Sequence, residues 1–257
     1  MKPDGLAVEI RARSHWEATD LGLALVQAHW RSLYSAWLAI LLPVIFLEAA
    51  LLWLLSDYEE SWPYIPILSW WLKPLYDRVL LHVLSRAVFG VKANWRDVLR
   101  ALPRLLLHSG LFRALTIGRL STRRSFRLPV WQLEGVSGKT RKQRFCALWG
   151  HGAARLFFLC IHLELILFLG IPGLLYLLLP TEFAPSLEFI WDDSQTSPWF
   201  FAIQILAGLL AMSIIEPFYV AAGFMLYLNR RTEIEGWDIE LGFRTLAARL
   251  NAQQAAP

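Results

Sequence analysis

The chain has 257 residues, of which 56% are hydrophobic and only 18% charged, and its mean hydropathy is +0.42. A water-soluble domain usually carries about 25% charge, so the excess of apolar residues, gathered in long runs, indicates a membrane protein. The net charge is +4, and the two cysteines do not form a CxxC pair, so we expect neither a disulfide framework nor a zinc knuckle.

The first 33 residues are expected to stay on the cytoplasmic side of the membrane. They carry charges of both signs without an apolar core behind a basic start, so we expect no cleavable signal peptide. Ser14 and Glu17 match a capping box at a helix start. An amphipathic helix lying on the membrane is predicted over residues 14–33. Its apolar stripe consists of Trp16, Leu23, Val26, Trp30 and Leu33.

Four stretches are apolar and long enough, or nearly so, to cross a membrane. A hydrocarbon core about 30 Å thick takes about 20 helical residues. The stretches are residues 34–56, 64–89, 156–179 and 199–228, of which the second is the weakest candidate. We therefore expect an all-α polytopic membrane protein with four transmembrane helices, amphipathic interfacial helices and a basic cytoplasmic loop.

The segments between these spans differ sharply in charge. Residues 57–63 contain three acids and residues 180–198 contain four, with no base in either, whereas residues 91–155 contain 14 Lys and Arg against two acids. Because Lys and Arg are retained in cytoplasmic loops, both chain ends and the basic segment are predicted in the cytoplasm. The expected divisions are 1–33, a transmembrane hairpin at 34–89, the basic segment at 90–155, a second hairpin at 156–229, and a tail at 230–257 with an amphipathic helix over 237–250.

A group of seven ionisable residues within the predicted spans gives the sharpest signal for a site. Such groups cost about 2.5–3.5 kcal/mol each at the centre of a bilayer on insertion scales, so they normally face inward and pair. Lys73 is expected to pair with Asp77, four residues later, and Arg78 to reach Glu216 or Glu48. The predicted cluster consists of Glu48, Lys73, Asp77, Arg78, His162, Glu164 and Glu216, with Glu216 close to the midplane.

Two interpretations of this cluster stay open. It is either a set of structural pairs that fixes helix packing, or a polar cavity or proton path that includes Glu216, Glu164 and His162. Pro217 removes the hydrogen-bond partner of the Ser213 carbonyl and predicts a helix kink beside Glu216. That kink is compatible with both interpretations, because proline is tolerated in membrane helices.

Catalytic and nucleotide-binding motifs are not recognised in the chain. The stretch "GVSGKT" at 135–140 is similar to the end of a phosphate-binding loop, but Leu133 occupies the position of its first glycine. His162 and Glu164 match half of a zinc-deaminase signature, and the cysteine half does not follow. We therefore expect no catalytic residue, no metal and no cofactor.

A basic run interleaved with aromatic residues is expected to contact anionic lipid head groups or a protein partner, and not nucleic acid. Arg230 and Arg231 are expected to anchor the last span at the lipid phosphates, and Trp237 to hold the tail at the interface. The run consists of Arg119, Arg123, Arg124, Arg127, Lys139, Arg141, Lys142 and Arg144.

The stretches "EPFYVAAGFMLYLNRRTEIEGWDIEL" at 216–241 and "FRLPVWQLEGVSGKTRKQR" at 126–144 resemble a group of bacterial inner-membrane proteins without an assigned activity. The final part is loosely similar to the membrane domain of glycerophosphodiester phosphodiesterases, which is not their catalytic part. The resemblance implies an inner-membrane location and an accessory role. In that signature, Glu233, Glu235 and Asp238 are expected to pair with the basic segment and tie the tail to it.

Three functions follow from these observations, in order of preference. The first is a non-catalytic accessory or scaffold subunit of a bacterial inner-membrane assembly, with a protein partner or self-association. The second is a small transporter or lipid-handling protein that uses the polar cluster around Glu216. The third is an intramembrane enzyme with Glu216 and Glu164 as its acids.

Overall fold

The computed structural model describes residues 11–55, 64–91, 94–108, 110–136, 138–149, 152–178 and 198–236. Within these ranges the regular structure is helical, and no strand occurs. The elements are α1 (His15–Ala28), α2 (Trp30–Leu55), α4 (Tyr64–Trp71), α5 (Lys73–Val88), α6 (Trp95–His108), α7 (Leu111–Leu115), η1 (Ile117–Leu120), α8 (Arg124–Gln132), α9 (Gly138–Ala147), α10 (Ala153–Leu178) and α11 (Pro198–Glu235).

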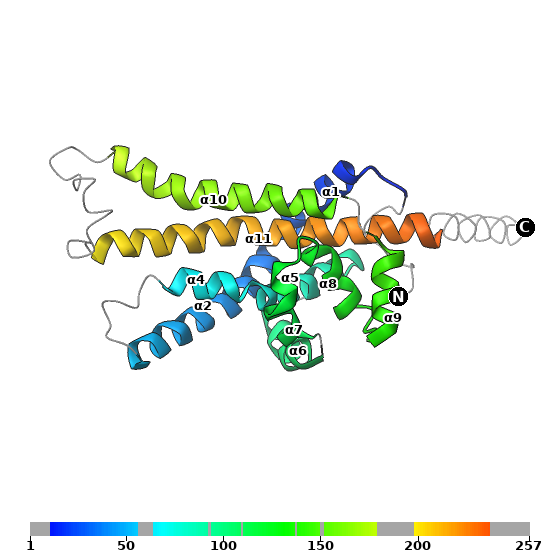
Figure 1. The fold of residues 1–257 in the computed structure, drawn as a ribbon, viewed down its shortest axis with the longest axis horizontal. Coiled ribbons are helices and arrows are strands. Elements are labelled where there is room, and N and C mark those ends of the chain that lie inside the picture. Colours follow the sequence, from blue (N-terminus) through cyan, green and yellow to red (C-terminus); the bar gives the residue numbers. More distant parts are fainter. Residues whose placement is uncertain are drawn as a thin grey trace, which may run out of the picture.

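The helices form a bundle organised around α11. Figure 1 shows α10 along one side of α11, with α2 and α4 on the other side. The shorter helices α8 and α9 lie beside the second half of α11, and α6 and α7 lie farther from it. α11 packs most extensively against α10, α1 and α8. α5 lies inside the molecule, where it contacts α2, α11, α6 and α8, and most of its side chains are buried.

Three helices in the described part of the chain are long and apolar enough to cross a membrane. They cover residues Trp30–Leu54, Ala153–Leu178 and Ala202–Glu235, and they overlap most of the first, third and fourth predicted spans. Large apolar side chains on their outer faces are exposed, including Phe46 on α2, Ile166 on α10 and Leu206 on α11. A soluble protein rarely exposes so continuous an apolar surface, so the three helices indicate a membrane-embedded protein.

The second predicted span is not one continuous helix. The chain turns at Leu72, between α4 and α5. Pro74 lies in the first turn of α5 and has no backbone N–H, so it cannot extend the hydrogen-bond ladder of α4. A second helix therefore starts at Lys73, and the ionisable residues of this stretch all belong to it.

The N-terminal helix α1 packs against α11. Ser14 caps α1, as predicted, by accepting a hydrogen bond from the Glu17 backbone N–H at 3.2 Å. At Gly22, a Cβ atom would lie 2.6 Å from the backbone of Ala222, so only glycine allows this approach. The predicted apolar stripe divides between two faces: Val26 and Leu33 are buried, whereas the outer face carries Trp16, Leu23 and Trp30.

Two prolines free backbone carbonyl groups that distant side chains then satisfy. Pro217 frees the carbonyl of Ser213, which accepts a hydrogen bond from the Tyr34 hydroxyl at 3.1 Å. Pro74 frees the carbonyl of Trp70, which accepts from Arg119 at 2.9 Å. α11 continues through Pro217 as one helix, and Figure 1 shows no sharp bend along it, so the proline produces a tertiary hydrogen bond without the predicted break.

Candidate functional site

Five charged side chains from four helices form a continuous chain of ion pairs inside the protein. The order is Glu164, Lys73, Glu216, Arg124 and Asp77, contributed by α10, α5, α11, α8 and again α5. Lys73 Nζ lies 2.6 Å from a carboxylate oxygen of both Glu164 and Glu216. Each cation therefore bridges two acids, and we call these five residues the ion-pair chain.

Arg124 continues the chain on the far side of Glu216. Its Nη2 lies 2.5 Å from Glu216 Oε1, and its Nε lies 2.9 Å from Asp77 Oδ2. Asp77, Glu216 and Arg124 are all buried. Charged groups that leave water need a partner, and the two bridging cations supply one for each of three carboxylates. Arg124 Nε and Asp77 lie close together as an ion pair without the geometry of a hydrogen bond.

Arg124 reaches Glu216 because α8 lies very close to α11. Phe126, Leu128 and Val130 of α8 are buried in the main core. A Cβ atom on Gly223 would lie 2.2 Å from Ser125 Oγ, so glycine at this position lets the start of α8 touch α11. The Tyr219 hydroxyl also accepts a hydrogen bond from the Ser125 backbone N–H at 3.3 Å. These contacts fix the helix that carries Arg124.

The structure changes several predicted assignments within the cluster. His162 is exposed on α10 and does not join the ion-pair chain; its Nδ1 lies 2.6 Å from the Phe158 carbonyl oxygen. Glu48 is buried apart from the chain and accepts a hydrogen bond from Ser69 at 2.6 Å, which connects α2 to α4.

The predicted pairing of Lys73 with Asp77 is replaced by pairs to other helices. Arg78, predicted to pair with Glu216 or Glu48, is buried beside the chain and donates a hydrogen bond to the Pro74 carbonyl.

The residues predicted to contact lipid or a partner lie in several different environments. Arg119 and Arg124 are buried inside the protein, away from the surface on which that contact was expected. Arg123 stacks 3.8 Å above the ring centroid of Trp149, and Arg144 pairs with acids. Arg230 and Arg231 pair with acids of their own helix. The remaining four, Arg127, Lys139, Arg141 and Lys142, line a cavity, and Trp237 lies outside the described residues.

Arg119 closes the side of the ion-pair chain next to α4. Its guanidinium lies 3.7 Å from the ring centroid of Trp70 while it donates to the carbonyl oxygen of the same residue. Burial and the neighbouring Arg124 guanidinium lower the pKa of Arg119 to about 10. The residues around this point enclose a space of only about 20 Å³, which is room for about one water molecule.

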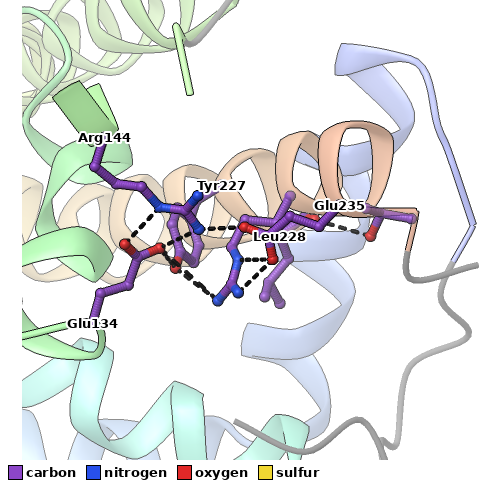
Figure 2. A network of polar contacts seen from close by, with 7 residues as sticks. Glu134, Arg144, Tyr227, Leu228 and Glu235 are labelled. Carbon is purple, nitrogen blue, oxygen red and sulfur yellow. Dashed lines mark hydrogen bonds and ion pairs between the residues drawn. The ribbon is translucent and has the colours of Figure 1, made fainter. Parts of the chain in front are cut away.

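A second polar network joins the basic segment to the end of α11, as Figure 2 shows. Arg144 Nε lies 2.7 Å from Glu134 Oε2, and Arg144 also pairs with Glu235. The Tyr227 hydroxyl donates to Glu134 at 2.6 Å, and Arg231 Nη2 lies 2.5 Å from Glu235 Oε2. The expected pairing of tail acids with the basic segment is thus confirmed for Glu235.

The other two tail acids give different results. Glu233 pairs within α11, with Arg230 at 2.8 Å, and also accepts a hydrogen bond from Asn229. Asn229 in turn exchanges two hydrogen bonds with the backbone of Arg13, at 2.8 and 2.9 Å. The third acid, Asp238, lies outside the described residues. The end of α11 is therefore held from two sides, by the basic segment and by the chain that precedes α1.

Sequence reasoning missed Arg124 as a member of the cluster, although a signal for it existed. The predicted spans contain four acids, Glu48, Asp77, Glu164 and Glu216, against three bases, Lys73, Arg78 and Arg86. Uncompensated charge in a membrane interior is costly, so the imbalance indicates a cation supplied from outside the spans. The sequence did not indicate which of the 14 Lys and Arg in residues 91–155 supplies it.

No family model, curated protein or solved structure matches this chain. The resemblance to a bacterial inner-membrane group stays a prediction.

Proposed function

We propose that the chain is an integral membrane accessory or scaffold subunit of a bacterial inner-membrane assembly, without catalysis of its own. The ion-pair chain is the observation that carries this proposal. It joins α5, α8, α10 and α11 through pairs of 2.5–2.9 Å, and the space beside Lys73, Glu216 and Arg119 holds only about one water molecule. Carboxylates held in this way act as fixed connections between helices. A rigid bundle of this kind suits a protein that holds partner subunits in place.

Four crossings, with both chain ends and the basic segment in the cytoplasm, are part of the proposal. In Figure 1 the end of α2, the start of α4, the end of α10 and the start of α11 all lie at one end of the molecule. The basic helices α8 and α9 lie away from that end. This arrangement supports a common side for the two acidic links. The second crossing would then combine lipid-facing α4 with protein-enclosed α5.

The ion-pair chain would lie near the cytoplasmic edge of the hydrocarbon core. Glu216 follows Pro198 by 18 residues in one helix, which is about 27 Å at 1.5 Å per residue. That length is close to the whole hydrocarbon thickness of about 30 Å. After Glu216, side chains of α11 from Tyr219 to Tyr227 are enclosed by protein. The expected midplane position is therefore replaced in this proposal by one at the membrane boundary.

Purification of the tagged chain from native bacterial membranes tests the scaffold role. We expect one or a few proteins to co-purify at a fixed ratio, and to recover the chain when they carry the tag instead. Glu216→Gln should retain these partners, because it preserves shape while Lys73 keeps Glu164 and Arg124 keeps Asp77 as ion-pair partners. A chain that is recovered alone from crosslinked membranes would contradict the proposal.

Lipid handling is the second candidate, and one cavity favours it. An apolar cavity of about 460 Å³ lies between α4, α10 and α11, with Glu164 at its wall. Its lining includes Ile67, Phe168 and Leu209, and it is large enough for part of an acyl chain. This candidate predicts that Glu216→Gln or Glu164→Gln abolishes lipid movement between vesicle leaflets while the protein stays folded and retains its partners.

A further inference from the structure

A second cavity, of about 630 Å³, opens between α5, α7, η1, α8 and α9. Its size is within the range of about 300–1,000 Å³ that is usual for sites of small ligands. Arg78 and Arg124 lie at its inner wall together with Asp77. The outer wall carries five more cations, Arg113, Arg127, Lys139, Arg141 and Lys142. We call this space the basic cavity.

The positive charge of the basic cavity is not balanced within the described part of the chain. Asp77 is the one acid in its lining, and it is already paired with Arg124. Among the described residues, no carboxylate forms an ion pair with any of the five outer cations. Arg144 differs, because it shares α9 with three of them and pairs with two acids.

Aromatic faces, and not carboxylates, hold two of these guanidinium groups in position. Arg141 lies 4.0 Å from the ring centroid of Trp131, and Arg127 lies 5.1 Å from that of Phe145. Burial, followed by the nearby charge of Arg113, lowers the pKa of Arg141. Burial, followed by the charge of Arg123, lowers the pKa of Arg127. An anion in the cavity would relieve this repulsion.

The first residues of α9, Gly138 and Lys139, also line the basic cavity. A helix start presents unpaired backbone N–H groups and a partial positive charge. This contribution is weaker than that of the side chains and has the same sign. Arg side chains present planar forks of N–H donors that match phosphate oxygens in pairs, and Lys binds phosphate as a point charge.

We infer that the basic cavity is a binding site for a phosphate-bearing anion, held by Arg113, Arg127, Arg141 and the two lysines of α9. A phosphate group fits the requirement for several negative oxygens facing guanidinium forks from more than one direction. It can belong to an anionic phospholipid head group or to a soluble phosphate compound. This inference concerns the cavity alone, so its failure would leave the proposed scaffold role unaffected.

The test uses the full chain purified in a neutral detergent, with two binding arms. One arm measures retention of phosphatidylglycerol against phosphatidylcholine by native mass spectrometry. The other measures pyrophosphate binding by calorimetry at constant ionic strength, with chloride as the reference anion. The cavity variants are Arg113→Gln with Arg141→Gln, and separately Lys139→Gln with Lys142→Gln. The matched control is Arg100→Gln with Arg104→Gln on α6, which removes the same charge at exposed positions.

We expect the wild type to bind in at least one arm. Both cavity variants should weaken that binding at least about tenfold, equivalent to about 1.4 kcal/mol, while the control changes it less than about twofold. Binding in the lipid arm alone identifies a head group, and binding in the pyrophosphate arm alone identifies a soluble compound. The inference is overturned if the wild type binds in neither arm, or if control and cavity variants lose affinity equally.

Discussion

Arg124 and Glu216 are 92 residues apart in the sequence, yet their side chains meet at 2.5 Å inside the protein. Arg124 begins α8 in the basic segment, and Glu216 lies halfway along α11. Their contact places a residue of the predicted cytoplasmic loop among the acids of the predicted membrane spans. The basic segment is therefore part of the core and does not only cover it.

Loss of Arg124 should destabilise the protein strongly. Arg124→Ala leaves Asp77 without its partner and Glu216 with Lys73 alone. Breaking a buried ion pair in this way costs about 3–5 kcal/mol. Unfolding of the purified protein in detergent measures the loss. Arg100→Ala is the control, since this exposed side chain makes only a 3.8 Å pair with Asp97, and surface changes stay within about 0.5 kcal/mol.

The same experiment has an internal check. Adding Asp77→Asn and Glu216→Gln to Arg124→Ala removes the stranded charges, so part of the lost stability should return. If the triple variant is as unstable as the sum of separate changes, the ion-pair chain does not act as a unit.

Substitution by alanine should have opposite effects at two glycines, because only one of them lies where two helices meet closely. Gly22→Ala places a methyl group against the Ala222 backbone and should destabilise the fold by about 1–3 kcal/mol, as overpacking does. Gly170→Ala on α10 meets nothing within 4 Å and should stabilise it by about 0.5–1 kcal/mol through helix preference. Thermal melting in detergent distinguishes the two. Equal effects would mean that α1 lies on the membrane and not on α11.

The hydrogen bond from the Tyr34 hydroxyl to the Ser213 carbonyl, which Pro217 leaves free, is open to a double-mutant cycle. Tyr34→Phe removes the donor to the Ser213 carbonyl and should cost about 1 kcal/mol. Pro217→Ala restores the backbone N–H that this carbonyl normally bonds. In that background Tyr34→Phe should be nearly silent. A cost that is unchanged by Pro217→Ala would show that the Tyr34 hydroxyl acts elsewhere.

The Glu134, Arg144 and Glu235 network should hold α9 against α11. Arg144→Ala removes charged hydrogen bonds to both acids and should cost about 1.5–3 kcal/mol. Hydrogen exchange should increase in α9 and at the end of α11. Lys142→Ala, at an exposed position of the same helix, provides the comparison, and equal exchange in both variants would rule out the role given to Arg144.

The native cysteines allow a direct test of topology. Cys146 on α9 is exposed, and Cys160 on α10 is buried. An impermeant maleimide should not label Cys146 in intact cells but should label it in inverted membrane vesicles. In a Cys146→Ser background, Leu178→Cys or Tyr64→Cys should show the reverse. Labelling of all three positions from one side would eliminate the four-crossing arrangement.

The sequence alone indicates that this protein is embedded in a membrane and that its fold is helical. Long apolar runs recur because a membrane helix must satisfy its backbone internally and face lipid. The bounds of α2, α10 and α11 follow from these runs to within several residues. Lys73, Asp77, Glu164 and Glu216 were also identifiable, since a charge in an apolar run is conspicuous without any knowledge of neighbours.

Tertiary structure alone decided which charges meet. A charge pair between helices depends on helix rotation and on how closely the helices approach. Gly223 and Gly22 permit a close approach because they lack a side chain, but the partner that each one meets is not encoded locally. His162 was predicted inside the cluster because depth along a span can be counted, whereas the face it occupies is set by how α10 packs on α11. Arg124 was predicted to contact lipid or a partner because its local sequence is basic. Its burial depends on acids contributed by helices distant in the chain.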